Sequence, residues 1–146
     1  MKIALASDHG GFDLKEIIKE YLIQKGYQVV DLGTDNNTDS VDYPKYGKLC
    51  ATNVVEGNAE RGIVFCGTGI GISIAANKVK GSRCALCTSV FMAQMAKCHN
   101  DANLLALGGR TTEPELAKEI VDTWLTGEFE GGRHQRRVDL LDGMEY

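Results

Sequence analysis

The sequence predicts an α/β protein, a Rossmann-like, three-layer doubly wound sandwich built on a five-stranded parallel sheet. Short apolar runs alternate with segments of helical spacing along the whole 146 residues, as in a parallel sheet with helices on both faces. The length suits one domain. No repeat, low-complexity stretch or linker interrupts the chain, so we expect residues 1–146 to form a single domain.

Five short apolar runs predict the strands, and a polar or glycine-rich stretch follows each of them. In sheets of this kind ligands bind at the carboxyl ends of the strands. The stretches after the runs therefore hold the candidate functional residues. The predicted strands cover residues 2–7, 27–33, 61–66, 83–88 and 103–108.

The segments between the strands have the apolar spacing of helices. After the first strand, Leu14, Ile18 and Leu22 share one helical face, and Gly26 provides a stop. Pro44 opens a helix that runs to about residue 56, because proline is favoured in the first helical turn. Further helices are expected from residue 72, over 90–99, over 114–125 and over 134–142.

Composition excludes several classes of protein. The formal net charge of −4 disfavours binding to nucleic acid. The first residues, MKIALASD, contain too few apolar positions for a signal peptide. No run approaches the roughly 18 apolar residues of a membrane span. Five cysteines, an odd number, without a secretory segment indicate reduced thiols, so we expect a cytoplasmic protein that binds no membrane.

The stretch FCGTGIGIS, residues 65–73, is the most informative loop. It reads G-x-G-x-G, and Ile72 stands where a dinucleotide fingerprint needs its third glycine. A Walker loop would need Gly-Lys-Ser/Thr, which is absent here. The remaining interpretation is a row of backbone amides at a helix N-terminus, which binds a phosphate or a developing oxyanion.

Cys66 directly precedes this loop. A helix N-terminus favours the thiolate form of a neighbouring cysteine. Base and oxyanion donors would then stand side by side. The alternative is a small hydrophobic residue that ends a buried strand. Cys84 and Cys87 form a C-x-x-C, but in a strand they point to opposite faces, which favours core packing over zinc binding.

The other polar candidates each allow two interpretations. Asp8 and His9 end the first strand, where Asp8 either contacts a ligand or caps the next helix. His99 follows a helix and either acts in catalysis or complements the helix dipole. Arg133 and Arg137 are one turn apart in the basic tail and, with Arg110, favour a phosphate site over a solvated face. Three scattered histidines predict no metal site.

Five blocks in order resemble the ribose-5-phosphate isomerase B family: ASDHGGFDLK, DYP, CGTGIGISIAANK, HNDANLLALGGR and EGGRHQRRV. They extend from about residue 2 to residue 142. The same superfamily includes galactose-6-phosphate isomerase subunits and relatives active on allose 6-phosphate. The resemblance implies a homodimer or a dimer of dimers whose sites are built from two subunits.

The resemblance implies a role for each matching position. Cys66 matches the base that moves a proton between C1 and C2, and Thr68 would assist proton shuttling. His99 matches the residue that opens the furanose ring, with Asp8 nearby on the sugar. Positions that bind the sugar, its phosphate or the enediolate oxygen are matched by His9, Tyr43, Gly67, Gly69, Ile70, Gly71, Asn100, Arg110, Arg133 and Arg137.

The expected function is the interconversion of D-ribose 5-phosphate and D-ribulose 5-phosphate through an enediolate. Aldose–ketose exchange needs a base, a polarised oxygen and a ring-opening acid/base, so no cofactor and no metal are expected. One alternative is an isomerase of six-carbon sugar phosphates such as allose 6-phosphate or galactose 6-phosphate. Another is a non-catalytic module that binds a sugar phosphate or a nucleotide through the same loop.

Overall fold

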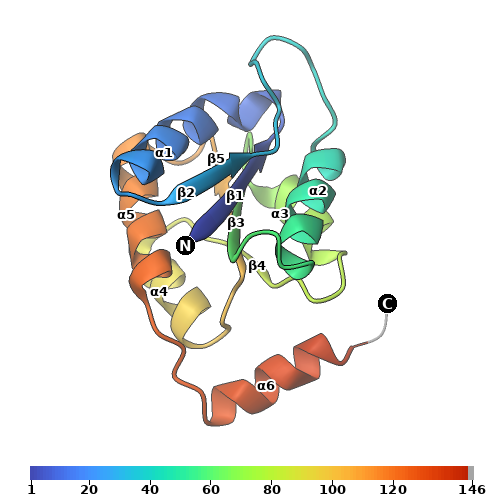
Figure 1. Cartoon of the computed structure of the whole chain (residues 1–146), viewed down its shortest axis with the longest axis vertical. Helices are drawn as coiled ribbons and strands as arrows, with labels where there is room; N and C mark the ends of the chain where they lie inside the picture. Colours follow the sequence, from blue (N-terminus) through green and yellow to red (C-terminus); the bar gives the residue numbers. More distant parts are fainter. Residues whose placement is uncertain (145–146) are drawn as a thin grey trace.

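The computed structural model describes residues 1–144. Its centre is one sheet in the order β2-β1-β3-β5-β4, in which every neighbouring pair of strands is parallel (Figure 1). The predicted α/β fold class is confirmed. The strands are β1 (Lys2–Ser7), β2 (Gln28–Asp31), β3 (Arg61–Cys66), β4 (Cys84–Leu86) and β5 (Leu104–Gly108).

The helices follow the predicted order, with one addition. A 3-10 turn that the sequence did not predict precedes the first long helix. Within the described residues the helices are η1 (His9–Gly11), α1 (Phe12–Gln24), α2 (Tyr43–Val55), α3 (Ile70–Asn77), α4 (Val90–Cys98), α5 (Pro114–Thr126) and α6 (Arg133–Asp142).

The two edge strands are shorter than predicted. Among the three inner strands, β1 and β3 keep their predicted bounds, and β5 begins one residue later than predicted. Runs 27–33 and 83–88 predicted strands of seven and six residues, but β2 spans Gln28–Asp31 and β4 spans Cys84–Leu86. Each edge strand has one neighbour, so only one side of its backbone is held in the sheet. β1 and β3 are paired on both sides.

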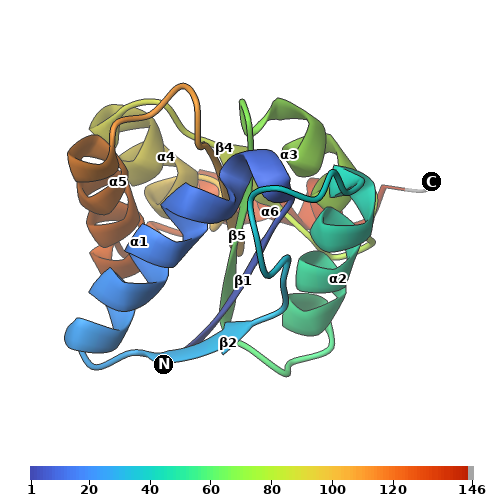
Figure 2. The same cartoon turned by 90° about the horizontal axis from the view of Figure 1, so that it is seen from above.

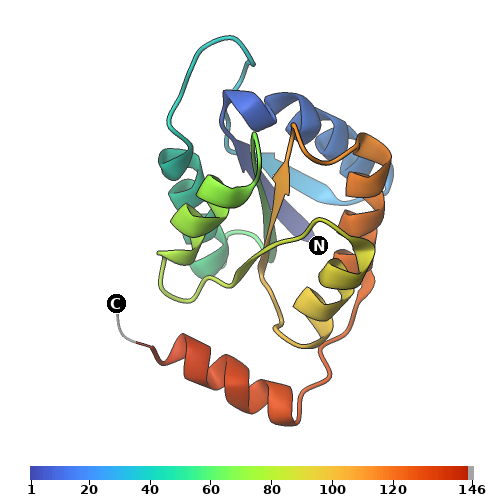
Figure 3. The same ribbon diagram turned by 180° about the vertical axis from the view of Figure 1, so that it is seen from behind.

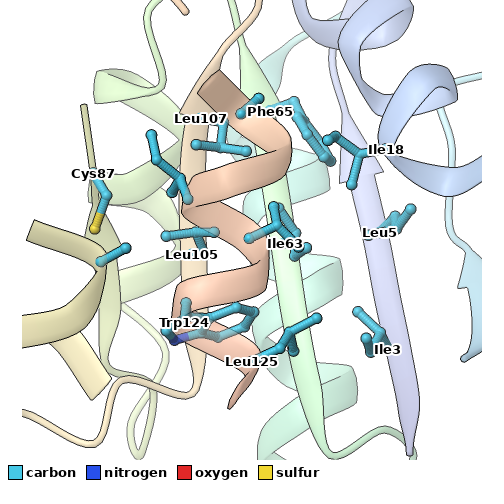
Figure 4. Packing of buried hydrophobic residues seen from close by; sticks show 14 of the residues in the cluster. Ile3, Leu5, Ile18, Ile63, Phe65, Cys87, Leu105, Leu107, Trp124 and Leu125 are labelled. Carbon is cyan, nitrogen blue, oxygen red and sulfur yellow. The ribbon is translucent and has the colours of Figure 1, made fainter. Parts of the chain in front are cut away.

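Helices α1, α4 and α5 cover one face of the sheet, and α2 and α3 cover the other (Figure 2). Alternate residues of each strand divide between the two faces because successive side chains point in opposite directions. On β3, Ile63 and Phe65 join the first cluster, while Val64 and Cys66 join the second. Figure 4 shows the first cluster, which includes the fully buried Trp124 of α5.

The face toward α2 and α3 is lined by small residues, which lets these helices approach closely. A Cβ added to Gly62 of β3 would lie 2.8 Å from the sulfur of Cys50 on α2. Burial raises the pKa of the Cys50 thiol to about 12. Cys84 packs in this layer and Cys87 in the other, so the predicted opposite orientation of the C-x-x-C pair is confirmed.

A buried ion pair joins α1 to β2. The side chain of Lys15 is fully buried, and its Nζ donates to both carboxylate oxygens of Asp31, at 2.8 and 2.9 Å. Lys19 donates to the same carboxylate at 3.0 Å. Burial alone would raise the pKa of Asp31. The hydrogen bonds from Lys15, the Gly33 amide and Lys19 outweigh burial, so the net pKa is lowered.

Helix α6 covers neither face of the sheet. Figures 1 and 3 show it apart from the other helices, beyond the end of the sheet where β1 begins. Arg83 ties its far end to the body through an ion pair with Asp142, whose Oδ1 lies 2.8 Å from Nη1. Leu140 and Leu141 remain 63% and 44% exposed. Helix α6 therefore carries apolar surface that the described residues of this chain leave uncovered.

Across residues 1–144, none of the helices combines the length and the apolar character that crossing a membrane requires.

Candidate active site

The candidate site begins at the point where the chain reverses its direction of winding. β2 lies on one side of β1 and β3 on the other. Helix α1, which follows β1, and helix α3, which follows β3, cover opposite faces of the sheet. Ligands of doubly wound folds bind outside the carboxyl ends of the strands at such a point. Asp8 and His9 follow β1, and the glycine loop follows β3, so both predicted motifs lie here.

The loop after β3 turns its backbone toward the sulfur of Cys66. The amide of Gly69 donates to Sγ at 3.1 Å, and the amide of Ile70 donates to Oγ1 of Thr68 at 3.2 Å. Gly69 has φ +79°, and a Cβ there would lie 2.7 Å from Leu86 and 2.9 Å from the backbone of β5. Only glycine permits this turn. Two of the predicted anion-binding amides are thus directed at Cys66 and Thr68.

Cys66 is 5% exposed and lies immediately before the N-terminus of α3. The amide hydrogen bond and the positive end of the helix dipole both stabilise negative charge on the sulfur. Because the sulfur is buried, its electrostatic contacts act in surroundings of lower dielectric constant than bulk water. The position therefore combines the two interpretations of the sequence, because Cys66 ends a buried strand and also faces an anion-stabilising loop.

Arg110 closes the site from the end of β5. A Cβ on Gly67 would lie 2.8 Å from its Nη1, and a Cβ on Gly10 would lie 3.3 Å from its Nη2. The amide of Arg110 also donates to the carbonyl of Gly67 at 2.8 Å. The guanidinium therefore packs on the backbone of Gly67 in the glycine loop and of Gly10 in η1, and it brings positive charge beside both.

Asp8 and His9 have defined hydrogen-bonding roles. Oδ1 of the buried Asp8 accepts from the Gly11 amide at 3.0 Å, which caps the 3-10 turn η1. Its second oxygen remains for a ligand. Nδ1 of His9 accepts from the Val41 amide at 3.1 Å. A neutral His9 must then carry its proton on Nε2, where it acts as a donor.

Tyr43 forms the wall on the side of α2. A Cβ on Gly71 would lie 2.6 Å from Cζ of the tyrosine ring, so the ring packs directly on the glycine loop. Tyr43 is 41% exposed. The aromatic side chain is therefore available to a ligand that enters beside the loop.

The remaining predicted residues lie elsewhere. In this chain His99, Asn100, Arg133 and Arg137 lie at the opposite end of the sheet from Cys66. His99 and Asn100 precede β5, and β5 pairs in parallel with β3 from Gly62↔Leu104 onward. A loop before a strand opens at the amino end of a parallel sheet. Arg133 and Arg137 project from α6, which lies below that end (Figures 1 and 3).

The second group has an organisation of its own. The rings of His99 and His134 stack with centroids 4.0 Å apart and an angle of 9° between their planes. Oε1 of Glu130 lies 3.6 Å from Nε2 of His99 and 3.5 Å from Nε2 of His134. Burial lowers the pKa of His134, and the charge of His99 and nearby arginines acts in the same direction. Two of the three histidines that are scattered in the sequence therefore meet in the fold.

A cavity of about 490 Å³ also opens at this end, between α6 and the β4 edge. Asn100 lines it, together with Arg83 and Leu141, whereas Cys66 and its loop do not. The cavity therefore lies at the same end of the sheet as His99 and Asn100, and not beside the thiol of Cys66.

The comparison with protein families matches residues 3–141 to the family described as Ribose/Galactose Isomerase. The chain belongs to this family.

Individual relatives agree with this assignment. Ribose-5-phosphate isomerase B of Escherichia coli is 47% identical over 144 residues, covering 99% of this chain and 96% of the relative. The solved ribose-5-phosphate isomerase B of Clostridium thermocellum has a TM-score of 0.95 and 56% identity, covering 97% of this chain and 95% of that one. The Mycoplasma genitalium enzyme, solved with bound ribulose 5-phosphate, has a TM-score of 0.93 and 44% identity, covering 97% and 93%.

Sequence reasoning missed Glu130 and His134 in this isomerase. His134 stands in the basic motif between Arg133 and Arg137, so its place in the motif was a usable signal. Glu130 carried no such signal, because a single glutamate in a loop is ordinary. Its position depends on Gly131 and Gly132, whose φ angles of +69° and +58° turn the chain into α6.

Proposed function

We propose that this chain interconverts D-ribose 5-phosphate and D-ribulose 5-phosphate, with Cys66 as the base. The observation that carries the proposal is the sulfur of Cys66 at the topological switch point, with the Gly69 amide directed at it at 3.1 Å. Family membership and the solved relative with bound ribulose 5-phosphate support this choice of substrate. No observation favours a six-carbon sugar phosphate or a purely binding role.

The proton transfer follows from the position of the thiolate. Cys66 takes the proton from C2 of the open-chain aldose, the electrons move toward the carbonyl, and an enediolate forms. The same thiol then returns the proton to C1, which produces the ketose. The N-terminus of α3 and the amides of loop 67–71 stabilise the developing negative charge. Thr68 and Asp8 move protons between the two oxygens, because Thr68 belongs to this loop and Asp8 follows the neighbouring strand.

Three side chains around the switch point hold the sugar. His9 donates from Nε2 to the sugar hydroxyls, Tyr43 lines the pocket, and Arg110 supplies positive charge at the switch point. These groups orient the carbon skeleton near the thiol, and remote binding energy of this kind is used to position the reacting atoms. The reaction is proposed to need no metal and no cofactor, since the side chains and backbone supply each acid, base and oxyanion donor.

Ring opening and phosphate binding are proposed to come from a second copy of the chain. One chain places His99 and Asn100, with Arg133 and Arg137, at the end of the sheet away from Cys66. The exposed leucines of α6 provide apolar surface for such an association. In this arrangement His99 of the second copy opens the furanose ring, and Arg133 and Arg137 bind the phosphate as charged forks.

The test is an assay of the purified chain with EDTA present. We expect turnover of ribose 5-phosphate, and slower turnover of allose 6-phosphate and galactose 6-phosphate. Activity that disappears in EDTA and returns with a divalent ion would contradict the metal-free mechanism. If a six-carbon sugar phosphate is turned over faster than ribose 5-phosphate, the six-carbon sugar phosphate would be assigned as the substrate instead.

The role of Cys66 is tested by Cys66→Ala, which should lower kcat by at least the about 10²–10⁴-fold typical of a general base. In deuterated water the wild-type product should gain deuterium at the exchanged carbon, and the variant should lose this exchange. The matched control is Cys98→Ala, which removes a thiol outside the site. Normal exchange in Cys66→Ala would place the base elsewhere.

A further inference from the structure

Three side chains at the amino end of the sheet form a cluster, and only His99 among them has a role in the proposed reaction. One imidazole nitrogen of His99, one of His134 and a carboxylate oxygen of Glu130 all lie within 4.8 Å of one another. Both imidazole nitrogens approach the same oxygen, at 3.6 and 3.5 Å. These separations exceed an ordinary hydrogen bond of about 2.7–3.2 Å. The three atoms therefore surround a small gap without closing it.

The two nitrogen–oxygen separations match those between ligands of a transition metal. Zinc binds imidazole nitrogen at about 2.0–2.1 Å and carboxylate oxygen at about 2.0–2.2 Å, in tetrahedral geometry. Two donors of a tetrahedron with such bonds lie about 3.4 Å apart. The two observed nitrogen–oxygen separations differ from this value by 0.1–0.2 Å. An ion would need little movement of the carboxylate, although each stacked ring must turn about its Cβ–Cγ bond to direct its lone pair inward.

The kinds of donor define the class of ion. Two histidines and one glutamate, with an open fourth position, is a donor set of catalytic zinc enzymes. Imidazole favours Zn²⁺, Cu²⁺ and Ni²⁺, whereas Mg²⁺ and Ca²⁺ prefer oxygen. The side chains of Glu130 and His99 are 54% and 35% exposed, so an ion can approach from solvent.

The backbone holds the donors in place before any ion binds. The amide of Glu130 donates to the carbonyl of Cys98 at 3.0 Å, which fixes the loop beside His99. The amide of His134 donates to the carbonyl of Gly131 at 3.1 Å in the turn that opens α6. Arg133 and Arg137 bring positive charge close by and oppose a cation. Metal binding therefore depends on Glu130, the one negatively charged ligand of the three.

We propose that His99, Glu130 and His134 form a binding site for a divalent transition metal of the Zn²⁺ class, and that its occupation inhibits the isomerase. The inhibitory half rests on the proposed function, because the ion would engage Nε2 of the histidine assigned to ring opening. Metal binding itself is independent of that assignment.

Binding is measured first, on the full-length chain, by titration of Zn²⁺ against a chromophoric chelator. The Glu130→Gln variant should bind zinc at least about 10–100-fold more weakly, which is the cost of losing even an outer-shell partner. The matched control is Glu128→Gln, an exposed glutamate in the same loop. It should bind like the wild type. Equal affinity in Glu130→Gln and wild type would overturn the site.

The ligand set is tested with Co²⁺ in place of zinc. A nitrogen and oxygen site gives visible d–d bands without the near-ultraviolet thiolate-to-cobalt charge-transfer band. A charge-transfer band would assign the ion to the cysteines and overturn the proposal. His134→Gln should abolish the d–d bands of wild type.

Inhibition is measured separately, with ribose 5-phosphate as substrate. Wild type and Glu128→Gln should lose activity at the zinc concentration that fills the site, and EDTA should restore it. Glu130→Gln should need at least about 10–100-fold more zinc for the same loss. Full occupation with unchanged turnover would overturn the inhibitory half. Absence of turnover without zinc would instead count against the proposed function and leave the binding result standing.

Discussion

Two inactive variants of this chain should restore each other's activity when they share a dimer. Cys66→Ala removes the proposed base from the carboxyl end of the sheet, and His99→Asn removes the ring-opening residue from the amino end. If each site takes one residue from each copy, a dimer of the two variants holds one complete site and one doubly defective site. An isolated hybrid should therefore have half of the wild-type activity, and a random equal mixture should have a quarter.

The separation within one chain follows from the register of β3 and β5. These strands pair from Gly62↔Leu104 to Cys66↔Gly108, four steps along the sheet. At about 3.3 Å per residue these four steps span about 13 Å. His99 precedes Leu104 by five further residues. The span of about 13 Å alone is several times the length of a hydrogen bond, which is about 3 Å. Both residues of one chain therefore cannot act on the same sugar carbon and ring oxygen.

The assay uses two affinity tags to isolate the hybrid and ribose 5-phosphate to measure turnover. The control pairs wild type with the double variant Cys66→Ala/His99→Asn. In a shared-site dimer both sites of this control lack one residue, so the hybrid should be inactive. In a dimer with separate sites the control would keep half of the activity, and the hybrid of single variants would have none. That reversed pattern would refute the reasoning.

Three further outcomes are expected. His99→Asn should lower turnover of ribose 5-phosphate more than turnover of an aldose phosphate too short to cyclise, and equal losses would contradict ring opening. Arg137→Ala should weaken the binding of substrate and of free phosphate by about 1.5–3 kcal/mol, the usual cost of a charged donor, and unchanged KM and phosphate inhibition would indicate a solvated residue. Asp31→Asn should destabilise the fold at neutral pH, because it leaves Lys15 buried without this carboxylate. The folded-state pKa of Asp31 is lowered, so its stabilisation is complete above the unfolded value of about 3.9 and is lost as the pH falls through the folded value. The difference in urea midpoint between wild type and Asp31→Asn should shrink in that acid range, and a constant difference would show that packing rather than charge is lost.

Much of the fold was predictable because the strands obey local rules. The apolar runs of the three inner strands match the structure to within one residue, since these strands are largely buried and paired on two sides. The glycine loop was also predictable, because the turn at Gly69 admits no side chain. Edge-strand lengths and the 3-10 turn after Asp8 depend on neighbours, which a single sequence does not display.

The cluster around Glu130 depended on contacts that no periodicity records. Two successive glycines with positive φ redirect the chain before α6, and a backbone hydrogen bond to Cys98 fixes the loop. Only then do His99 and His134 stack beside the carboxylate. His99 and His134 each stand in a motif visible in the sequence, but nothing in the sequence indicates that they meet at Glu130, so this meeting could be found only in the structure.

The division of the site between two ends of the sheet, by contrast, was implicit in the order of elements. In a parallel sheet a residue that follows a strand lies at the carboxyl edge, and a residue that follows a helix and precedes a strand lies at the amino edge. Asp8, Cys66 and Arg110 belong to the first kind, and His99 belongs to the second. A mechanism that needs Cys66 and His99 on one small sugar therefore already requires two chains. We propose that the second chain packs on the uncovered leucines of α6, and the hybrid dimers measure whether the two chains share their sites.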